Sequence, residues 1–455
     1  MLRVTWVQPE DLVAHQLAAM RIDGCDVDEI ERQWVRAGGN PVPPAGGAGT
    51  EAGAELRALA RALLDQLDQL EPPPALLAAE PDDLEDIEAS RQAPDPPDRD
   101  RPGHSTIEDD RLLGGWLGRA AGCLLGKPVE KIPREGIRAI AASTGNWPLR
   151  GYFSGAGLDA DVAARYPWNR ASRATSLAEN IAGMPEDDDL NFALLALDLV
   201  ERHGNALTTD DVAAAWLASL PGGRVFTAER VTYRNLLDGH PPAVAGRLRN
   251  PFQDWIGAQI RADVYGWVCP GDPPTAARLA WTDARLSHHR NGVYGAMFVA
   301  AASAAAVVAR SIGECIDAGL SVVPPASRYA AAIRRGVELG SGPLDAEAAL
   351  DELYRDFGHL HWVHVLDNAA LAAFALTRSH GDFVTAITTA VSGGWDTDST
   401  GATVGALTGA LAGAAALPAD WIDPLQNRLA SSMPGWDSVS FDELARRTAA
   451  ARLQA

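Results

Sequence analysis

Lysine is almost missing from this sequence, which has two lysines, Lys127 and Lys131, among its 455 residues. Acidic residues outnumber lysine and arginine by 60 to 39, so the formal net charge is −21. A chain with this charge repels phosphate backbones, and no stripe of basic residues is present to overcome the repulsion. The composition therefore excludes DNA and RNA as expected partners.

Cysteine is scarce as well. The chain has four cysteines, which are far apart and form no CxxC pair: Cys25, Cys123, Cys269 and Cys315. Such cysteines suit a reducing compartment. The first residues run directly into Gln8-Pro9-Glu10-Asp11 without the apolar h-region of a secretory signal. We therefore expect a cytoplasmic protein.

Long hydrophobic runs and strand-like alternation are also absent. Two stretches, 295–309 and 402–417, are dominated by alanine and glycine, and both are shorter than the roughly 20 apolar residues that a membrane span needs. β-branched and aromatic residues rarely cluster in the alternating pattern of strands. We expect no membrane partner and an all-α protein in which both stretches form buried helices.

The length exceeds the usual size of one hydrophobic core, so an appended unit is expected. Residues 9–38 and 51–70 have amphipathic helical spacing, which predicts a small N-terminal helical appendage at 1–70. Residues 71–104 are rich in Pro and Asp and predict a linker with one helical turn near 83–89. The main domain, 105–455, should open at the capping box Ser105-Thr106-Ile107-Glu108. Further helices are expected at 189–203, 209–218, 274–286, 294–309, 326–338, 345–356, 363–377 and 381–391.

Glycine recurs with a four-residue period in two places. The first set is Gly114, Gly118, Gly122 and Gly126, and the second is Gly401, Gly405, Gly409 and Gly413. Glycine costs about 1 kcal/mol relative to alanine inside a helix, so a repeated glycine face requires a compensating gain. We expect that gain to be close approach between helices.

Two acidic motifs each precede a buried helical run. Glu186-Asp187-Asp188-Asp189 stands before a leucine-rich segment, and Gly393-Gly394-Trp395-Asp396-Thr397-Asp398-Ser399-Thr400-Gly401 stands before the second glycine face. One Asp would cap a helix, but carboxylates about 4 Å apart repel by roughly 4 kcal/mol at an effective dielectric of 20. Taken together, the motifs indicate a cation site, and oxygen ligands select Mg²⁺ or Mn²⁺. Five carboxylates can accommodate two such ions.

This combination resembles the ADP-ribosylglycohydrolase family, of the type that includes the glycohydrolase reactivating dinitrogenase reductase. That family carries a Thr/Ser-Asp-Asp-Thr segment and a C-terminal Gly-Asp-Thr-Asp-Thr/Ser segment, in the same order. Its early glycine-rich helix, which ends in a glutamate, is similar to residues 118–130. The resemblance, to a bacterial subset with an N-terminal helical extension, covers roughly residues 110–420. It implies a compact, all-α, multi-helix orthogonal bundle.

Carried over by position, the resemblance implies a set of metal ligands, namely Glu186, Asp187, Asp188, Asp396, Asp398 and Ser399. Glu130 falls where some members keep a catalytic acid, and Glu130 or Asp188 is implied as the base toward water. Three positions depart from the family pattern. Glu186 replaces a Thr/Ser ligand, Cys123 stands where many members have Asp, and Trp395 takes a glycine position.

Polar residues elsewhere are candidates for substrate binding. Blocks 254–263 and 287–295 are similar to an active-site wall of the bacterial subset, which implies that Asn291 and Gly292 lie near the ligand. The HxHxxH spacing at 359–364 fits no zinc pattern. The resemblance makes His364 and Asn368, four apart on one helix face, candidates for ribose or diphosphate contacts, and Trp395 would shape what docks beside the metals.

The expected function is a metal-dependent hydrolase that cleaves an N- or O-ribosyl bond, removing ADP-ribose from a modified protein side chain or a small molecule. Two alternatives stay open: a hydrolase acting on a free nucleoside or nucleotide metabolite, and a non-catalytic ADP-ribose-binding protein. An isoprenoid synthase is also all-helical with Mg²⁺ between Asp-rich helices, but the first motif lacks its four-residue acidic spacing. The oligomeric state and the role of residues 1–70 do not follow from the sequence.

Overall fold

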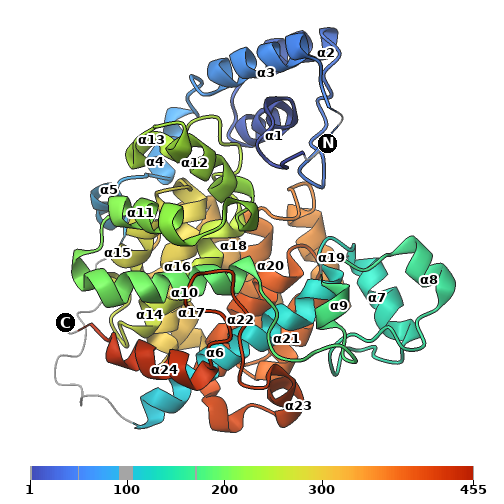
Figure 1. Cartoon of the computed structure of the whole chain (residues 1–455), viewed down its shortest axis with the longest axis vertical. Helices are drawn as coiled ribbons and strands as arrows, with labels where there is room; N and C mark the ends of the chain where they lie inside the picture. Colours follow the sequence, from blue (N-terminus) through green and yellow to red (C-terminus); the bar gives the residue numbers. More distant parts are fainter. Residues whose placement is uncertain (1–2, 50, 92–105, 170–171, 454–455) are drawn as a thin grey trace.

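The computed structural model of the chain describes residues 3–49, 51–91, 106–169 and 172–453. Across these ranges the protein consists of helices α1 to α24 and short 3-10 helices, with isolated β-bridges instead of strands (Figure 1). The all-α prediction is confirmed. No helix within the described ranges combines the length and the apolar character needed to cross a membrane.

Residues 9–67 form a lobe at the top of Figure 1 from three helices: α1 (Pro9–Ile22), α2 (Asp28–Arg36) and α3 (Ala54–Leu67). Their apolar faces share one core cluster with side chains of the body, so the lobe is packed against it. Trp6 illustrates the contact, because its ring meets the edges of Phe252 and Trp255 with centroids 5.5 and 5.6 Å apart. Aromatic pairs of this kind contribute beyond the area that they bury.

The segment expected to be a linker is partly folded. Helices α4 (Pro74–Ala79) and α5 (Leu84–Ser90) lie between the lobe and the body. Between them the Glu80 carboxylate is buried, accepting hydrogen bonds from Arg328 Nε at 2.7 Å and from Asn291 Nδ2 at 2.8 Å. Residues 74–90 therefore anchor the lobe to the body. The expected capping box requires Ser105, which lies outside the described residues.

The body contains the remaining helices around one large core. In chain order they are α6 (Thr106–Gly126), α7 (Arg134–Ser143), α8 (Ala160–Arg165), α9 (Arg173–Ser176), α10 (Asp188–His203), α11 (Thr209–Ser219), α12 (Thr227–Leu237), α13 (Pro242–Ala245), α14 (Asp263–Trp267), α15 (Pro273–Ala284), α16 (Arg290–Ala306), α17 (Ile312–Leu320), α18 (Arg328–Ser341), α19 (Ala346–Phe357), α20 (Val365–Arg378), α21 (Phe383–Ser392), α22 (Thr397–Ala412), α23 (Ala419–Ile422) and α24 (Phe441–Ala450).

Helices α6 and α22 pack against each other along the two glycine faces, as the period predicts. A Cβ atom added at Gly118 would lie 2.2 Å from the carbonyl oxygen of Gly405, and one at Gly122 would lie 2.0 Å from that of Gly401. Real Cβ atoms do not approach backbone this closely, so glycine is required on both sides. This backbone contact fixes the N-terminus of α22, with its acidic motif, beside the C-terminal end of α6.

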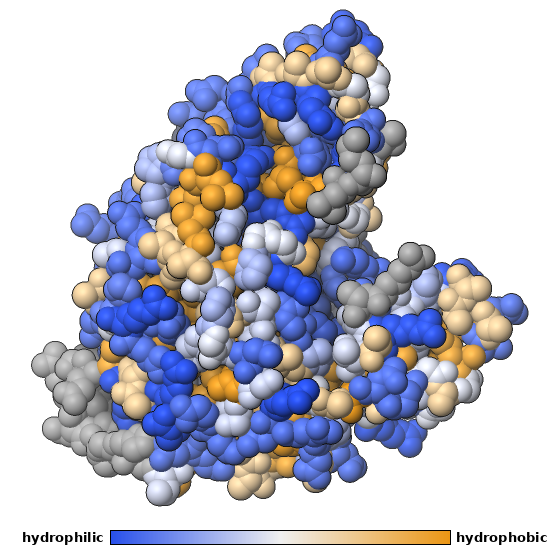
Figure 2. Space-filling model, viewed as in Figure 1, coloured by the Kyte–Doolittle hydropathy of each residue, from blue (hydrophilic) through white to orange (hydrophobic). Residues whose placement is uncertain are grey.

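The surface in the view of Figure 2 is largely hydrophilic, and its hydrophobic side chains form scattered patches, several of them near the N-terminal lobe. Individual apolar side chains on a protein surface are ordinary. The acidic motifs therefore lie on a compact helical scaffold whose buried contacts hold them in place.

Candidate metal and catalytic site

The two acidic motifs meet at the N-termini of α10 and α22. Asp187 caps α10, and its Oδ1 accepts a hydrogen bond of 2.9 Å from the backbone N–H of Asp189. Asp396 precedes α22, and Asp398 lies in its first turn. The Ser399 hydroxyl donates a 3.3 Å hydrogen bond to Asp189 Oδ2. Residues about 210 positions apart in sequence therefore share one site.

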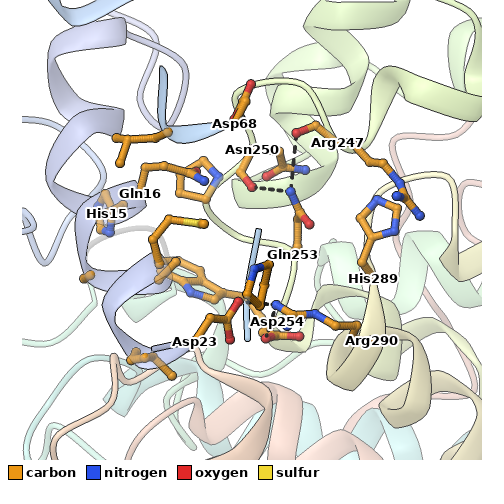
Figure 3. A pocket seen from close by; sticks show the side chains of 18 of the residues that line it. His15, Gln16, Asp23, Asp68, Arg247, Asn250, Gln253, Asp254, His289 and Arg290 are labelled. Carbon is orange, nitrogen blue, oxygen red and sulfur yellow. Dashed lines mark hydrogen bonds and ion pairs between the residues drawn. The ribbon is translucent and has the colours of Figure 1, made fainter. Parts of the chain in front are cut away.

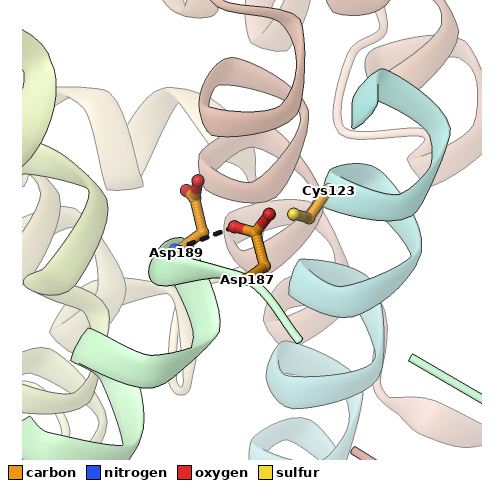
Figure 4. Close-up of side chains that lie close together, drawn as sticks. All are labelled: Cys123, Asp187 and Asp189. Atoms are coloured by element: carbon orange, nitrogen blue, oxygen red, sulfur yellow. Dashed lines mark hydrogen bonds between the residues drawn. The ribbon is translucent and has the colours of Figure 1, made fainter. Parts of the chain in front are cut away.

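Helix α6 forms the third wall. Cys123 Sγ and one carboxylate oxygen each of Asp187 and Asp189 lie within 4.8 Å of one another (Figure 4). At the end of the same helix the Thr397 hydroxyl donates to the carbonyl of Gly126 at 2.9 Å. This bond and the glycine contact connect both motifs to α6.

Lys127, which directly follows α6, is buried and forms an ion pair with Asp187 Oδ2. Burial opposes the charge of the lysine, but the neighbouring carboxylate keeps the pKa of Lys127 above its ordinary value. The ion pair also stabilises the charged form of Asp187. Burial disfavours the Asp187 carboxylate, yet the ammonium group outweighs it and lowers the pKa of Asp187.

The surroundings of the other carboxyl groups in the cluster oppose their ionisation. Burial, with the nearby Asp187 and Asp398 carboxylates, raises the pKa values of Asp188 and Asp189 well above the ordinary range. Burial and Asp398 do the same to the pKa of Asp396. Carboxylates in mutual repulsion out of water are stabilised by cations, and this cluster has more acids than cationic side chains.

Asp189 is the most enclosed member of the cluster, at 2% exposure. Its Oδ1 has no hydrogen-bond partner among the residues that the structure describes, and Arg119 Nη2 lies 3.7 Å away. Arg119 is itself fully buried and is paired with Asp263, so its charge is already shared. An unsatisfied buried carboxylate oxygen is costly unless a further ligand binds it.

Glu130 lies at the edge of the cluster. Its Oε2 accepts a 2.6 Å hydrogen bond from Asn169 Nδ2, and Lys131 Nζ lies 3.0 Å from its Oε1. Burial and the Asp398 carboxylate raise the pKa of Glu130 to about 7. A carboxyl group with this pKa can accept or donate a proton near neutral pH.

Asn368, expected to bind substrate, instead holds the second motif. Its Oδ1 accepts hydrogen bonds from Asp396 N at 3.1 Å and from the Thr400 hydroxyl at 3.0 Å, and its Nδ2 donates to the carbonyls of Trp362 and His364. These contacts use both donors and the acceptor of a fully buried amide. Asn368 therefore acts as a positioning residue for the carboxylate of Asp396.

Glu186 is not brought into the cluster. Its Oε1 accepts from Asn191 Nδ2 at 2.8 Å, and its Oε2 lies 3.2 Å from Arg224. The cap residue Asp187, between Glu186 and the helix, has an extended backbone with φ −156° and ψ 149°. Asp189, which lay outside the predicted ligand set, is the carboxylate that faces Cys123 and Ser399.

Trp395 also differs from its expected role. After the turn at Gly393 and Gly394 its backbone is left-handed, with φ 57°, and its ring stacks on Tyr354 with centroids 4.5 Å apart. The Tyr354 hydroxyl donates to the carbonyl of Gly393 at 2.8 Å. The indole is 7% exposed, so it supports the turn and presents little surface to a ligand.

The remaining predicted substrate contacts lie away from the carboxylates that meet Ser399. The amide of Asn291 bridges Glu80 and the backbone N–H of Tyr329, at 2.8 and 3.0 Å. Gly292 is required by packing, since a Cβ there would meet the carbonyl of Gln253 at 2.2 Å. His364 caps α20 and borders a separate cavity beside the N-terminal lobe.

One feature of the sequence could have identified more of the site. Both lysines of the chain are here, one paired with Asp187 and the other with Glu130. In a chain with so few lysines, two of them within five residues of the end of a glycine-faced helix are a signal. Arg119 and Asp263 gave no such signal in the sequence, because their pairing depends on helices that are far apart along the chain.

The donor set fits a hard divalent cation. Aspartate oxygens and the Ser399 hydroxyl are the ligands that Mg²⁺ and Mn²⁺ prefer. Burial and the Asp187 carboxylate raise the pKa of Cys123 above its ordinary value. The orphaned Oδ1 of Asp189 supplies a ligand atom that no protein group satisfies within the described chain.

Comparison with known proteins identifies the family of the chain. The family model for ADP-ribosylglycohydrolase matches residues 104–454. Among solved structures, a chain of an ADP-ribosylglycohydrolase-related protein complex is 22% identical, with 76% of this chain and 98% of that chain covered and a TM-score of 0.46. A search of curated proteins found no match. The family match excludes the isoprenoid synthase alternative, and the chain belongs to the ADP-ribosylglycohydrolase family, whose members are glycohydrolases.

Proposed function

We propose that this glycohydrolase uses divalent cations to cleave the N- or O-ribosyl bond that joins ADP-ribose to a modified side chain or small molecule. The observation that carries the proposal is the meeting of residues 187–189 with residues 396–399, where Ser399 bonds to Asp189. We assign this activity to residues 105–455, with residues 1–70 as an appendage.

The charges at the site support two Mg²⁺ or Mn²⁺ ions. Five aspartates, one lysine and one arginine leave three uncompensated negative charges, and one divalent ion carries two positive charges. The aspartates are Asp187, Asp188, Asp189, Asp396 and Asp398, and the cationic side chains are Lys127 and Arg119. When bound, such ions would orient ribosyl hydroxyls and activate water. The proposed ligands are these aspartates and Ser399, with Glu186 left outside.

Glu130 is the proposed base. It lies beside the cluster, and its partners Asn169 and Lys131 hold its two oxygens in fixed directions. It would accept the proton of the water that attacks the anomeric carbon. Positive charge then builds on the sugar ring, and the carboxylates around it stabilise that charge as in other glycoside cleavages. Asp188, half-buried at the start of α10, is the second candidate for the proton.

The proposal is tested with Asp187→Asn and Asp398→Asn proteins. Release of ADP-ribose from ADP-ribosyl-arginine, ADP-ribosyl-serine and 1″-linked esters is followed with Mg²⁺ and with EDTA, and Mn²⁺ binding is titrated separately. We expect the unmodified protein to act on one of these compounds in Mg²⁺ but not in EDTA. Both variants should lose cleavage and cation binding. Asp210→Asn, an exposed position on α11, is the matched control.

Four results would contradict the proposal. Full activity in EDTA would show that cleavage needs no divalent cation, and unchanged cleavage by both variants would show that it does not need the acidic cluster. Cleavage of plain nucleosides alone would assign the enzyme to free metabolites. Tight ADP-ribose binding without turnover of any compound would make the chain a binding protein.

A further inference from the structure

A second cavity, of about 730 Å³, lies between the N-terminal lobe and the body. Helices α1 and α3 form one side, and residues 247–254, 289–290 and 359–364 form the other. None of the acidic-motif residues described above is among those lining it. About half of the wall comes from residues that precede the family match at 104–454.

The cavity wall carries buried polar atoms whose hydrogen bonds are unmade. Gln16 and His289 are 4% and 6% exposed, and Gln16 Oε1 and His289 Nε2 have no partner in the described part of the chain. Figure 3 shows Gln16 on α1 at one side of the cavity and His289 at the other, with Gln253 and Asp254 between. Buried polar atoms are normally satisfied, so unmade bonds around a cavity of this size indicate a missing ligand.

The orientation of His289 makes its free nitrogen an acceptor. Its Nδ1 lies 3.7 Å from the Asp82 carboxylate, which favours the proton on that nitrogen. Burial lowers the pKa of His289 to about 3, so the ring is neutral. With Gln16 Oε1, the cavity thus offers two unused acceptors from opposite sides.

Carboxylates outnumber guanidinium groups on the wall. The four acids are Asp23, Asp68, Asp82 and Asp254, and the two bases are Arg247 and Arg290. Arg290 and Arg328, the latter outside the wall, both pair with Asp23 and lie 3.8 Å from Asp254, and Arg247 lies 3.2 Å from Asp82. Asp68 has no ion pair in the described ranges and accepts one hydrogen bond there, from the backbone N–H of Arg249 at 2.8 Å. An anionic ligand is therefore disfavoured, and a cation is favoured.

Apolar side chains form another part of the wall. Met20, Leu67 and Leu70 from the lobe face the cavity opposite Val244 and Leu248 from the body. A fully hydrated metal ion gains nothing from such a wall. A cation with a hydrocarbon body does, because it removes that apolar surface from water.

We propose that this cavity binds a small organic cation of the alkylammonium or alkylguanidinium class. The charged head lies at the Asp68 carboxylate and donates to Gln16 Oε1, and the alkyl body lies against Met20 and Leu67. The site is separate from the acidic cluster and does not require divalent ions.

Calorimetric titration of the full chain tests this proposal, with 1,5-diaminopentane, n-butylammonium and n-butylguanidinium as probes and butyrate as the matched anion. We expect at least one cation to bind and butyrate not to bind. Asp68→Asn and Gln16→Leu should each weaken cation binding by about tenfold or more, as expected for loss of a charge-assisted hydrogen bond. Glu55→Gln, at an exposed position on α3 and outside the cavity wall, is the control and should bind normally.

An Asp187→Asn protein separates this site from the proposed active site. Cation binding should persist in that variant and in EDTA, whatever happens to ribosyl cleavage. The proposal is overturned if no cation binds, if butyrate binds instead, or if Asp68→Asn and Gln16→Leu proteins with normal unfolding curves bind as well as the unmodified chain. Loss of binding in Asp187→Asn would also overturn it.

Discussion

Ser399 donates a hydrogen bond of 3.3 Å to the carboxylate of Asp189, although α22 follows α10 by roughly 200 residues. The other carboxylate oxygen of Asp189 has no hydrogen-bond partner in the described chain. Asp189 thus connects the two motifs at the proposed cation site. Its contacts agree better with a role as a metal ligand than those of Glu186 do.

Asp189→Asn should therefore reduce Mn²⁺ affinity and ribosyl cleavage by about 100-fold or more, since changes even to residues behind metal ligands cost 10–100-fold. Glu186→Gln should change both by far less. Asp198→Asn, on the same helix α10 and paired with Arg202, serves as the control. Cation titration and kcat/KM are the measurements. Equal losses in the Asp189 and Glu186 variants would restore Glu186 to the ligand set.

The glycine contact between α6 and α22 makes a stability prediction. A Cβ at Gly405 would lie 2.2 Å from the carbonyl oxygen of Gly118, so Gly405→Ala should destabilise the fold by about 1–3 kcal/mol through overpacking. At Gly223 nothing lies within 4 Å of an added Cβ, and Gly223→Ala should be nearly neutral. Urea unfolding measures both. Equal stability of the two variants would mean that the helices separate without cost.

The helical class and the pairing of α6 with α22 were predictable because a four-residue glycine period reports backbone contact directly. The convergence of the two motifs was predictable from mutual repulsion among carboxylates that no local feature explained. Each of these signals can be read within a short segment of the sequence, the glycine spacing within each helix and the run of acids within each motif.

The ligand register and the cavity were not predictable in this way. Which of Glu186 and Asp189 faces the cluster depends on the local path of the chain into α10, which the sequence does not specify. The resemblance made Asn368 a candidate ligand contact, and the sequence does not reveal that a buried backbone N–H and a hydroxyl of the second motif need its side-chain oxygen. The cavity exists only where the lobe and the body meet, and residues 1–70 carry no sign of that contact.

Protonation of buried histidines should destabilise the junction between lobe and body. Burial lowers the pKa of His15 to about 3, and burial with His364 lowers that of His361 to about 4. The unfolded chain, with a pKa near 6.5, takes up these protons first, so stability is complete above pH 6.5 and falls toward pH 4. Each group contributes a slope of up to about 1.4 kcal/mol per pH unit.

His15→Gln should therefore flatten the dependence of the unfolding free energy on pH between 6.5 and 4. His240→Gln, at a partly exposed position, should leave the slope unchanged. Urea unfolding across this pH range provides the comparison. A slope that is identical in all three proteins would show that His15 is protonated without cost in the fold.

Glu130→Gln should lower kcat by about 100- to 10,000-fold, the usual contribution of a general base, while Mn²⁺ affinity changes little. Because burial and Asp398 raise the pKa of Glu130 to about 7, kcat/KM of the unmodified enzyme should fall as the pH drops below 7. That acidic limb should be missing from the residual activity of the variant. A limb that persists in Glu130→Gln would transfer the base role to another group, with Asp188 the next to be tested.

Lys127 and the proposed cations stabilise the same carboxylates, which gives the sharpest test of the electrostatics. Lys127→Met leaves Asp187 buried without its ammonium partner, and breaking a buried pair costs about 3–5 kcal/mol. A divalent ion that binds the freed carboxylate should recover part of this loss, so the rise in Tm on adding Mg²⁺ should be larger than in the unmodified protein. Lys131→Met is the matched control, because its side chain is 48% exposed and its partner is Glu130. If Mg²⁺ raises the Tm of the Lys127 variant no more than that of the control, the Asp187 carboxylate is not part of a cation site.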